Sequence, residues 1–166
     1  MKKLILLLTI CMWSLHSMGQ TELATWSLTN GANATSINGV TASAITPAGI
    51  VTNYSGTGFR TNAWTDTFAA TDYFQIAVKP SGASAITVTG LNFNQTRNGD
   101  GPTNYKIKYY ISNSGSTITN NQFFNATNNG DVTWVNSASI ANNGTVQLTL
   151  PSAITLSTTQ ELFIRF

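Results

Sequence analysis

The segment Tyr105-Lys106-Ile107-Lys108-Tyr109-Tyr110-Ile111 decides the fold class, because apolar or aromatic residues occupy every second position in it. A period of two places these residues on one face of a β-strand and the lysines on the other face. Helical spacing does not recur along the chain. The segment therefore predicts a strand with one buried face.

The same alternation continues outward from this segment in both directions. It recurs in residues 24–28, 73–78, 146–150 and 162–166. Asn-Gly pairs, which tolerate positive φ in tight turns, begin at Asn30, Asn38, Asn98, Asn129 and Asn143. Short strands with turn signals at this spacing predict an all-β fold, an antiparallel β-sandwich of about nine or ten strands.

One register detail can be predicted at Gly90. Ile86 and Val88 lie in even phase, whereas Leu91 and Phe93 lie in odd phase, so the apolar face slips by one residue. A one-residue insertion in a strand is a β-bulge, and glycine adopts the backbone angles that a bulge can require. We expect a bulge at Gly90.

The first residues have the three parts of a secretory signal peptide. Lys2 and Lys3 form a positive start, residues 4–13 are apolar, and Ser17-Met18-Gly19 places small residues before Gln20. The apolar run is too short for a transmembrane anchor. We expect a signal peptide at 1–19, a single domain at 20–166, and a protein that is secreted or displayed on the cell surface.

Removal of this leader changes which chemistries are available. Cys11 and His16 are the only cysteine and histidine, and both lie inside the leader. Ser-His-Asp and Cys-His catalysis are therefore excluded, and a zinc site would lack its preferred ligands. A mechanism that uses two carboxylates is the one enzymatic route left open. We expect a protein that is not an enzyme.

The leader also accounts for the basic character of the chain. Without Lys2 and Lys3, the number of Lys and Arg residues equals the 6 Asp and Glu residues. Nucleic-acid binding depends on clustered positive charge. Nucleic acid is therefore not an expected partner.

An ordered set of motifs resembles a known family. The set comprises Trp26-Ser27, residues 39–43, 58–64, 72–80, 86–93 and 97–105. It resembles the jelly-roll modules of bacterial exported surface proteins, which often lie beside nuclease, phosphoesterase or C-terminal sorting domains, and it is strongest over residues 24–112. The resemblance implies a jelly-roll topology and carries over no catalytic residues.

Members of that family usually continue past a strand like 162–166 into a closing strand. We therefore expect a C-terminally truncated domain that lacks its closing strand. A sheet in that state keeps an unprotected edge, and Leu162-Phe163-Ile164 is an apolar segment without proline. Such edges recruit other chains.

Carbohydrate binding is the leading specific activity, because sugar sites combine an aromatic platform with a few polar groups. Residue types of this kind are Tyr54, Phe59, Arg60, Trp64, Arg97 and Trp134. Strand alternation assigns Trp26 and Trp134 to the core, whereas Trp64 lies outside any clear alternation. The candidate ligand-binding set is therefore Tyr54, Phe59, Arg60, Trp64 and Arg97, and the candidate ligand is a polysaccharide or another cell-surface component.

A structural calcium ion is a weaker candidate, and no other cofactor is expected. Calcium takes oxygen ligands from Asp, Asn and carbonyl groups. Asn98, Asp100 and Asn104 crowd one predicted loop, in a spacing that is not that of an EF-hand. Asn and Asp also occur in turns where their side chains cap the local backbone.

These observations favour a non-catalytic extracellular accessory or adhesion module. Two alternatives stay open at this point. One is a structural domain of a larger surface-sorted protein whose activity lies beyond residue 166. The other is an outer-membrane β-barrel, because the chain ends in an alternating segment with a terminal aromatic residue, although most runs are shorter than membrane-spanning strands.

Overall fold

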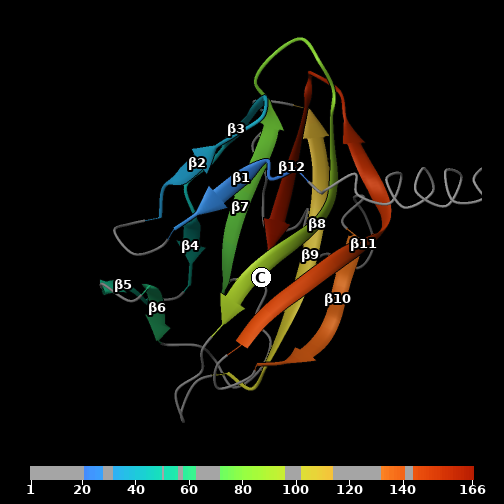
Figure 1. Cartoon of the computed structure of the whole chain (residues 1–166). Coiled ribbons are helices and arrows are strands. Elements are labelled where there is room, and N and C mark those ends of the chain that lie inside the picture. The colour runs from blue at the N-terminus through green and yellow to red at the C-terminus, as the bar shows by residue number, and fades with distance from the viewer. Residues whose placement is uncertain are drawn as a thin grey trace, which may run out of the picture.

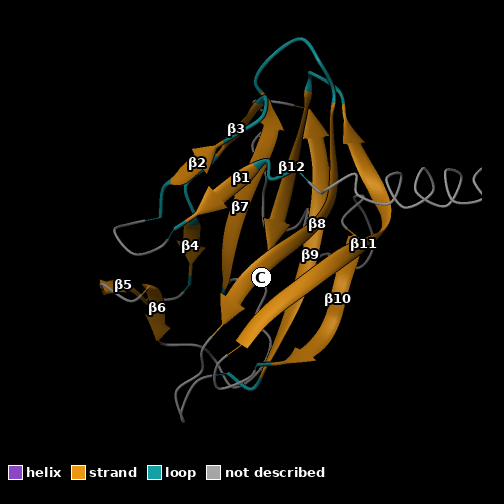
Figure 2. Ribbon diagram, viewed as in Figure 1, coloured by secondary structure: helices purple, strands orange, loops and turns teal. Residues whose placement is uncertain are grey.

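Twelve β-strands make up the secondary structure of the residues that can be described, and no helix occurs among them (Figure 2). The computed structural model describes residues 21–27, 32–49, 51–55, 58–62, 72–95, 102–113, 132–140 and 144–166, the side chains of 51–62 excepted. The strands are β1 (Ala24–Trp26), β2 (Ala34–Ser36), β3 (Val40–Ala42), β4 (Thr46–Ala48), β5 (Val51–Ser55), β6 (Gly58–Asn62), β7 (Tyr73–Pro80), β8 (Ile86–Gln95), β9 (Asn104–Asn113), β10 (Val132–Ser139), β11 (Gly144–Leu156) and β12 (Gln160–Arg165).

The strands form antiparallel sheets that pack together, which confirms the all-β sandwich predicted from the sequence. The largest sheet has six strands in the order β10-β9-β12-β7-β3, with β4 also paired to β7. The pairs β8-β11 and β1-β2 lie across one face of this sheet (Figure 1). The strand count exceeds the predicted nine or ten because β1 to β4 are short segments of three residues each.

The core lies between the six-stranded sheet and the layer that contains β8 and β11. Ile107 of β9, Leu156 of β11 and Leu162 of β12 are at most 1% exposed. They belong to one apolar cluster with Val40, Ile76, Val78, Ile86, Val88, Leu150, Ile154 and Ile164. Burial of a side chain of this size contributes about 1.5 to 3 kcal/mol, so this cluster holds the two layers together.

The apolar segment near the C-terminus lies in the interior of the sheet. β12 is hydrogen-bonded to β7 on one side and to β9 on the other. Its residues Leu162, Phe163 and Ile164 are all buried. The expectation that this segment forms an exposed, unprotected edge is therefore wrong, because its apolar run reflects burial on both faces of a central strand.

The edge of the sheet at β10 is irregular. Its pairing with β9 shifts between Thr133 and Val135 and again between Val135 and Ala138. Bulges of this kind twist an edge strand and make it a poor template for another chain. The fold thus protects this edge by its own geometry.

The tryptophans assigned to the core do pack against it. Trp26 and Trp134 are partly buried against the main cluster. The Nε1 of Trp26 donates to the carbonyl of Ser43 at 2.7 Å, and the Nε1 of Trp134 donates to the carbonyl of Thr149 at 3.2 Å. Each ring therefore buries its apolar body and satisfies its N–H group at a neighbouring segment.

Two turn and register predictions can be checked. Asn38 and Gly39 have φ values of 51° and 80°, which confirms one of the five Asn-Gly turns; the other four pairs are not fully within the described residues. At Gly90 the pairing is irregular, but residues 150–153 of β11 oppose Thr89 alone. The extra residues thus belong to β11, and the prediction that β8 carries the insertion is wrong.

The glycine itself has a steric cause. A Cβ atom at Gly90 would collide with the carbonyl oxygen of Leu148 and would lie 3.4 Å from the carbonyl carbon of the same residue. The backbone of β11 therefore lies so close to β8 at Gly90 that a side chain at this position would prevent the approach.

Candidate functional site

The candidate site is the outer face of the six-stranded sheet, opposite the core. Alternation along β7, β9 and β12 divides their residues between the two faces. The inward residues are those of the main apolar cluster. The outward residues are Tyr73, Gln75, Ala77 and Lys79 of β7, Lys106, Lys108, Tyr110 and Ser112 of β9, and Glu161, Phe163 and Arg165 of β12. We call this set the outer face.

A polar row crosses the outer face at Arg165. In register, Arg165 lies opposite Gln75 on one side and opposite Lys108 on the other. Its Nε donates to Oε1 of Gln75 at 2.8 Å, and its guanidinium carbon lies 3.8 Å from the centre of the Tyr73 ring. The side chain is 2% exposed. These contacts fix a cation within the sheet surface.

The charge of Arg165 is set by two opposing effects. Burial lowers the pKa of Arg165, whereas the nearby Tyr73 raises it through an electrostatic interaction and a hydrogen bond. An arginine side chain stays protonated in proteins at neutral pH. Arg165 is therefore a permanent positive charge directly opposite Lys108, and like charges that face each other across a sheet are destabilising.

An aromatic row lies next to the polar row. Phe163 is opposite Ala77 on β7 and opposite Tyr110 on β9. Phe163 and Ala77 are buried and form a second apolar cluster against which Tyr110 packs. The partly exposed Tyr110 ring is thus held from one side by Phe163.

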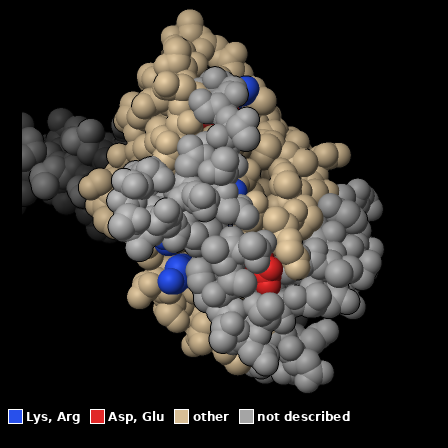
Figure 3. All heavy atoms as spheres, turned by 180° about the vertical axis from the view of Figure 1, so that it is seen from behind, with Lys and Arg blue, Asp and Glu red and all other residues tan. Residues whose placement is uncertain are grey.

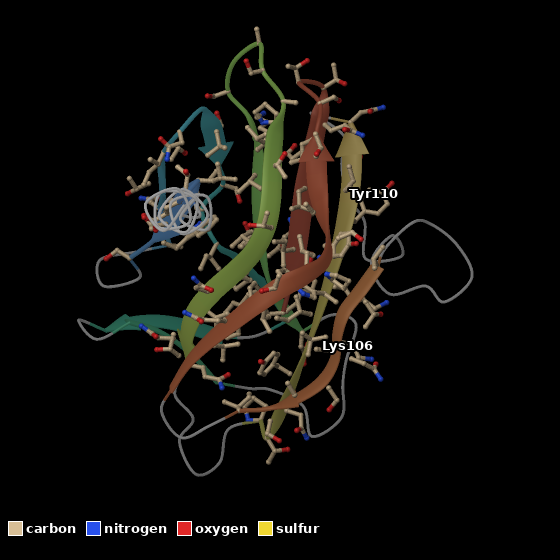
Figure 4. All side chains as sticks on the ribbon, turned by 45° about the vertical axis from the view of Figure 1, so that its right-hand side comes forward. Lys106 and Tyr110 are labelled. Carbon is tan, nitrogen blue, oxygen red and sulfur yellow. The ribbon has the colours of Figure 1, made fainter. Side chains whose placement is uncertain are left out.

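Lys106 and Tyr110 extend from β9 to the same side of the sheet (Figure 4). Both are partly exposed. The strands β7, β9 and β12 together carry one carboxylate, that of Glu161, and four cations. The cations are Lys79, Lys106, Lys108 and Arg165. Both Lys or Arg atoms and Asp or Glu atoms are visible on this side of the molecule in the space-filling view from behind (Figure 3). The described part of the outer face therefore combines aromatic rings with cations that have interaction partners of their own.

Only part of the carbohydrate site predicted from the sequence is described. Tyr54 of β5 is opposite Phe59 of β6, and Arg60 is opposite Asn53. The hairpin thus brings three of the predicted residues together in the backbone register. Trp64 and Arg97 lie outside the described residues.

The predicted calcium ligands are likewise only partly described. Asn104 begins β9. Its Nδ2 donates a hydrogen bond to the hydroxyl oxygen of Thr103 at 3.2 Å, and its Oδ1 accepts one from the hydroxyl group of Ser139 at 3.4 Å. Asn98 and Asp100 lie outside the described residues. Within the part of the chain that is described, no three His, Cys, Asp or Glu side chains gather as metal ligands.

Sequence reasoning did not select the outer face as a site. The alternating lysines of 105–111 signalled that β9 has a polar side. Tyr73 and Arg165, however, are distant in sequence and become neighbours only because β12 inserts between β7 and β9. A search for polar positions on interior strands would have found Arg165 only after the strand order was known.

The described residues contain no helix with the length and hydropathy needed to cross a membrane. No protein-family model, curated protein or solved structure matches the chain.

Proposed function

We propose that this protein is an exported, non-catalytic accessory or adhesion module that binds carbohydrate at the cell surface. The observation that carries the proposal is the outer face, where an aromatic row and a polar row lie side by side. Carbohydrate sites need an aromatic surface for a sugar ring and a few fixed polar groups for orientation. Tyr110 supplies the aromatic surface, and the cations beside it supply the polar groups.

Two sequence features support the rest of the proposal. The leader supports export. The absence of histidine and cysteine beyond the leader supports a binding role, because the common nucleophile and base pairs cannot be assembled from the remaining residues. Jelly-roll modules of exported surface proteins, which the sequence resembles, are consistent with this role.

Affinity electrophoresis of the mature protein tests the proposal directly. The gels contain neutral polysaccharides, namely xylan, mannan and mixed-linkage β-glucan, or the acidic polysaccharide polygalacturonate. We expect retardation by at least one of them, its loss in Tyr110→Ala, and its retention in Tyr110→Phe, which keeps the ring. A mature protein that migrates identically in every gel would refute carbohydrate binding.

The candidate residues predicted from the sequence, which include Trp64, give a competing assignment for the same function. If Trp64 is the platform, Trp64→Ala should abolish retardation while Tyr110→Ala leaves it intact. The melting temperatures of both variants show whether either loss arises from unfolding. Retardation that depends on Trp64 alone would assign the carbohydrate site to the residues predicted from the sequence and not to the outer face.

A further inference from the structure

The edge of β8 that faces away from β11 is open within the described part of the chain. There β8 pairs with β11 alone, and residues 90–95 have no hydrogen bond to any other described element. In an antiparallel pair, every second residue turns its backbone N–H and C=O groups away from the partner strand. The edge of β8 is therefore a row of backbone donors and acceptors to which another strand can bind.

The other strands at sheet edges, within the described ranges, are short or irregular. β1 to β6 are three to five residues long, and β10 has two register shifts. β11 has a bulge that contains Pro151, and its Thr149 carbonyl accepts the indole N–H of Trp134. Short strands, bulges and proline are devices that prevent an edge from pairing with other chains.

Residues 90–95 of β8, Gly-Leu-Asn-Phe-Asn-Gln, lack these devices. They pair with β11 in continuous register, and β8 contains neither proline nor a charged residue. Leu91 and Phe93 pack against the core and are partly buried, whereas Asn92 and Asn94 are exposed. Short segments without charge or proline, in which amide side chains can form ladders, are those that pair with identical segments of other chains.

A second copy of the chain matches the chemistry of this edge. Two antiparallel copies of one strand, related by a twofold axis, form a self-complementary contact. An uncharged strand places no like charges opposite each other in that arrangement. Side chains of the same types already bond between β8 and β11, where the hydroxyl of Thr145 donates to Oδ1 of Asn94 at 2.8 Å. Two strands are a marginal sheet, and self-pairing of β8 extends them to four.

We propose that two copies of the protein associate through antiparallel pairing of residues 90–94 of β8, with Asn92 on the twofold axis. The register follows from the two faces of the strand, because inward residues must lie opposite inward residues. An axis at Asn92 places Leu91 opposite Phe93 of the second copy. An axis at Phe93 would instead place Leu91 opposite Gln95, which loses an apolar contact.

Sedimentation velocity of the mature protein tests the association. One strand edge is smaller than a standard interface, so we expect a reversible dimer that is populated at about 100 µM and dissociates at about 1 µM. The mean sedimentation coefficient should therefore rise with concentration from the value of a monomer toward that of a dimer. A single monomeric species throughout this range would overturn the proposal.

Charged variants on the axis test the register. Asn92→Lys and Asn92→Asp each place like charges opposite each other and should weaken dimerisation by at least about tenfold. An equimolar mixture of the two variants should restore the dimer, because Lys then faces Asp. Gln147→Lys is the matched control, since Gln147 lies opposite Asn92 on the same exposed face but one strand farther from the axis. It should leave dimerisation unchanged, and equal melting temperatures exclude unfolding.

A cysteine cross-link gives an independent readout. Cys11 is the only cysteine and is removed with the predicted leader, so an introduced cysteine is unique in the mature chain. Oxidation of Asn92→Cys should give a covalent dimer, whereas Gln147→Cys should not, because a disulfide needs its two Cα atoms within about 7 Å. A cross-link formed by Gln147→Cys alone, or a mixture of the Lys and Asp variants that stays monomeric, would overturn pairing at Asn92.

Discussion

The inner and outer faces of β7, β9 and β12 are built from the same strands but hold different residues. The inner face consists mainly of Ile, Leu and Val side chains, with Tyr105 and Tyr109 packed beside them, and it lies against β8 and β11. The outer face has buried Phe163 and Ala77 at its centre, with Arg165 and the lysines beside them. The difference teaches that β12 is buried on both sides while only one of those sides is the main core.

Truncation of a side chain on the inner face should have the largest effect on the free energy of unfolding. Ile107 is fully buried, so Ile107→Ala should lower the free energy of unfolding by about 2 to 5 kcal/mol, the sum of lost burial and a cavity. Ile107→Val is the matched control and should cost about 0.5 to 1.5 kcal/mol. Urea denaturation followed by fluorescence measures both, and a loss under about 1 kcal/mol for the alanine variant would contradict a tightly packed inner face.

An effect of intermediate size on the free energy of unfolding is expected at Arg165, the buried cation of the outer face. Arg165→Ala removes the hydrogen bond to Gln75 and the stacking on Tyr73, and it should cost about 1 to 3 kcal/mol. Gln75→Ala, which leaves the stacking in place, should cost less. The same denaturation experiment compares them, and equal losses would show that the stacking on Tyr73 contributes nothing.

The neighbouring residue of Ile107 sharpens the contrast between the faces. Lys108 points outward and lies opposite Arg165, so Lys108→Gln should change the free energy of unfolding by no more than about 0.5 kcal/mol. A slight gain is expected at low salt because a like-charge neighbour is removed. A loss comparable to that of Ile107→Ala would mean that the outer face is as essential to the fold as the core.

The smallest effect depends on pH. Burial raises the pKa of Tyr105 above its ordinary value of 10.0. The unfolded chain therefore loses this proton first, and the contribution of Tyr105 to stability is complete below pH 10 and declines as the pH rises from there through the folded-state pKa. The stability difference between wild type and Tyr105→Phe should be constant below pH 10 and should shift in favour of the variant above it.

Thermal denaturation at several pH values measures this difference. The Tyr105 ring packs edge-on against the Phe93 ring, with the two ring centres 5.8 Å apart. The Tyr105→Phe variant retains that contact. A stability difference that does not change between pH 9 and pH 11 would show that the hydroxyl of Tyr105 is equally solvated in both states.

Much of the fold followed from local patterns. The alternation in 105–111 predicted β9 with its inward and outward residues, because side chains in a strand alternate between faces. The Asn38-Gly39 turn was predictable because those residue types tolerate positive φ. The irregularity near Gly90 was predictable in position, but its assignment to β11 depended on the partner strand.

The site depended on long-range order. The sequence by itself determined that the chain forms short strands, which side chains of each alternating segment share a face, and that Cys11 and His16 are its only cysteine and histidine. Only the tertiary structure decided that β12 lies between β7 and β9, which seats Arg165 against Tyr73 and Gln75, with Lys108 opposite. The physical reason is that alternation is a property of a single strand, whereas strand order is set by the burial of whole faces against one another.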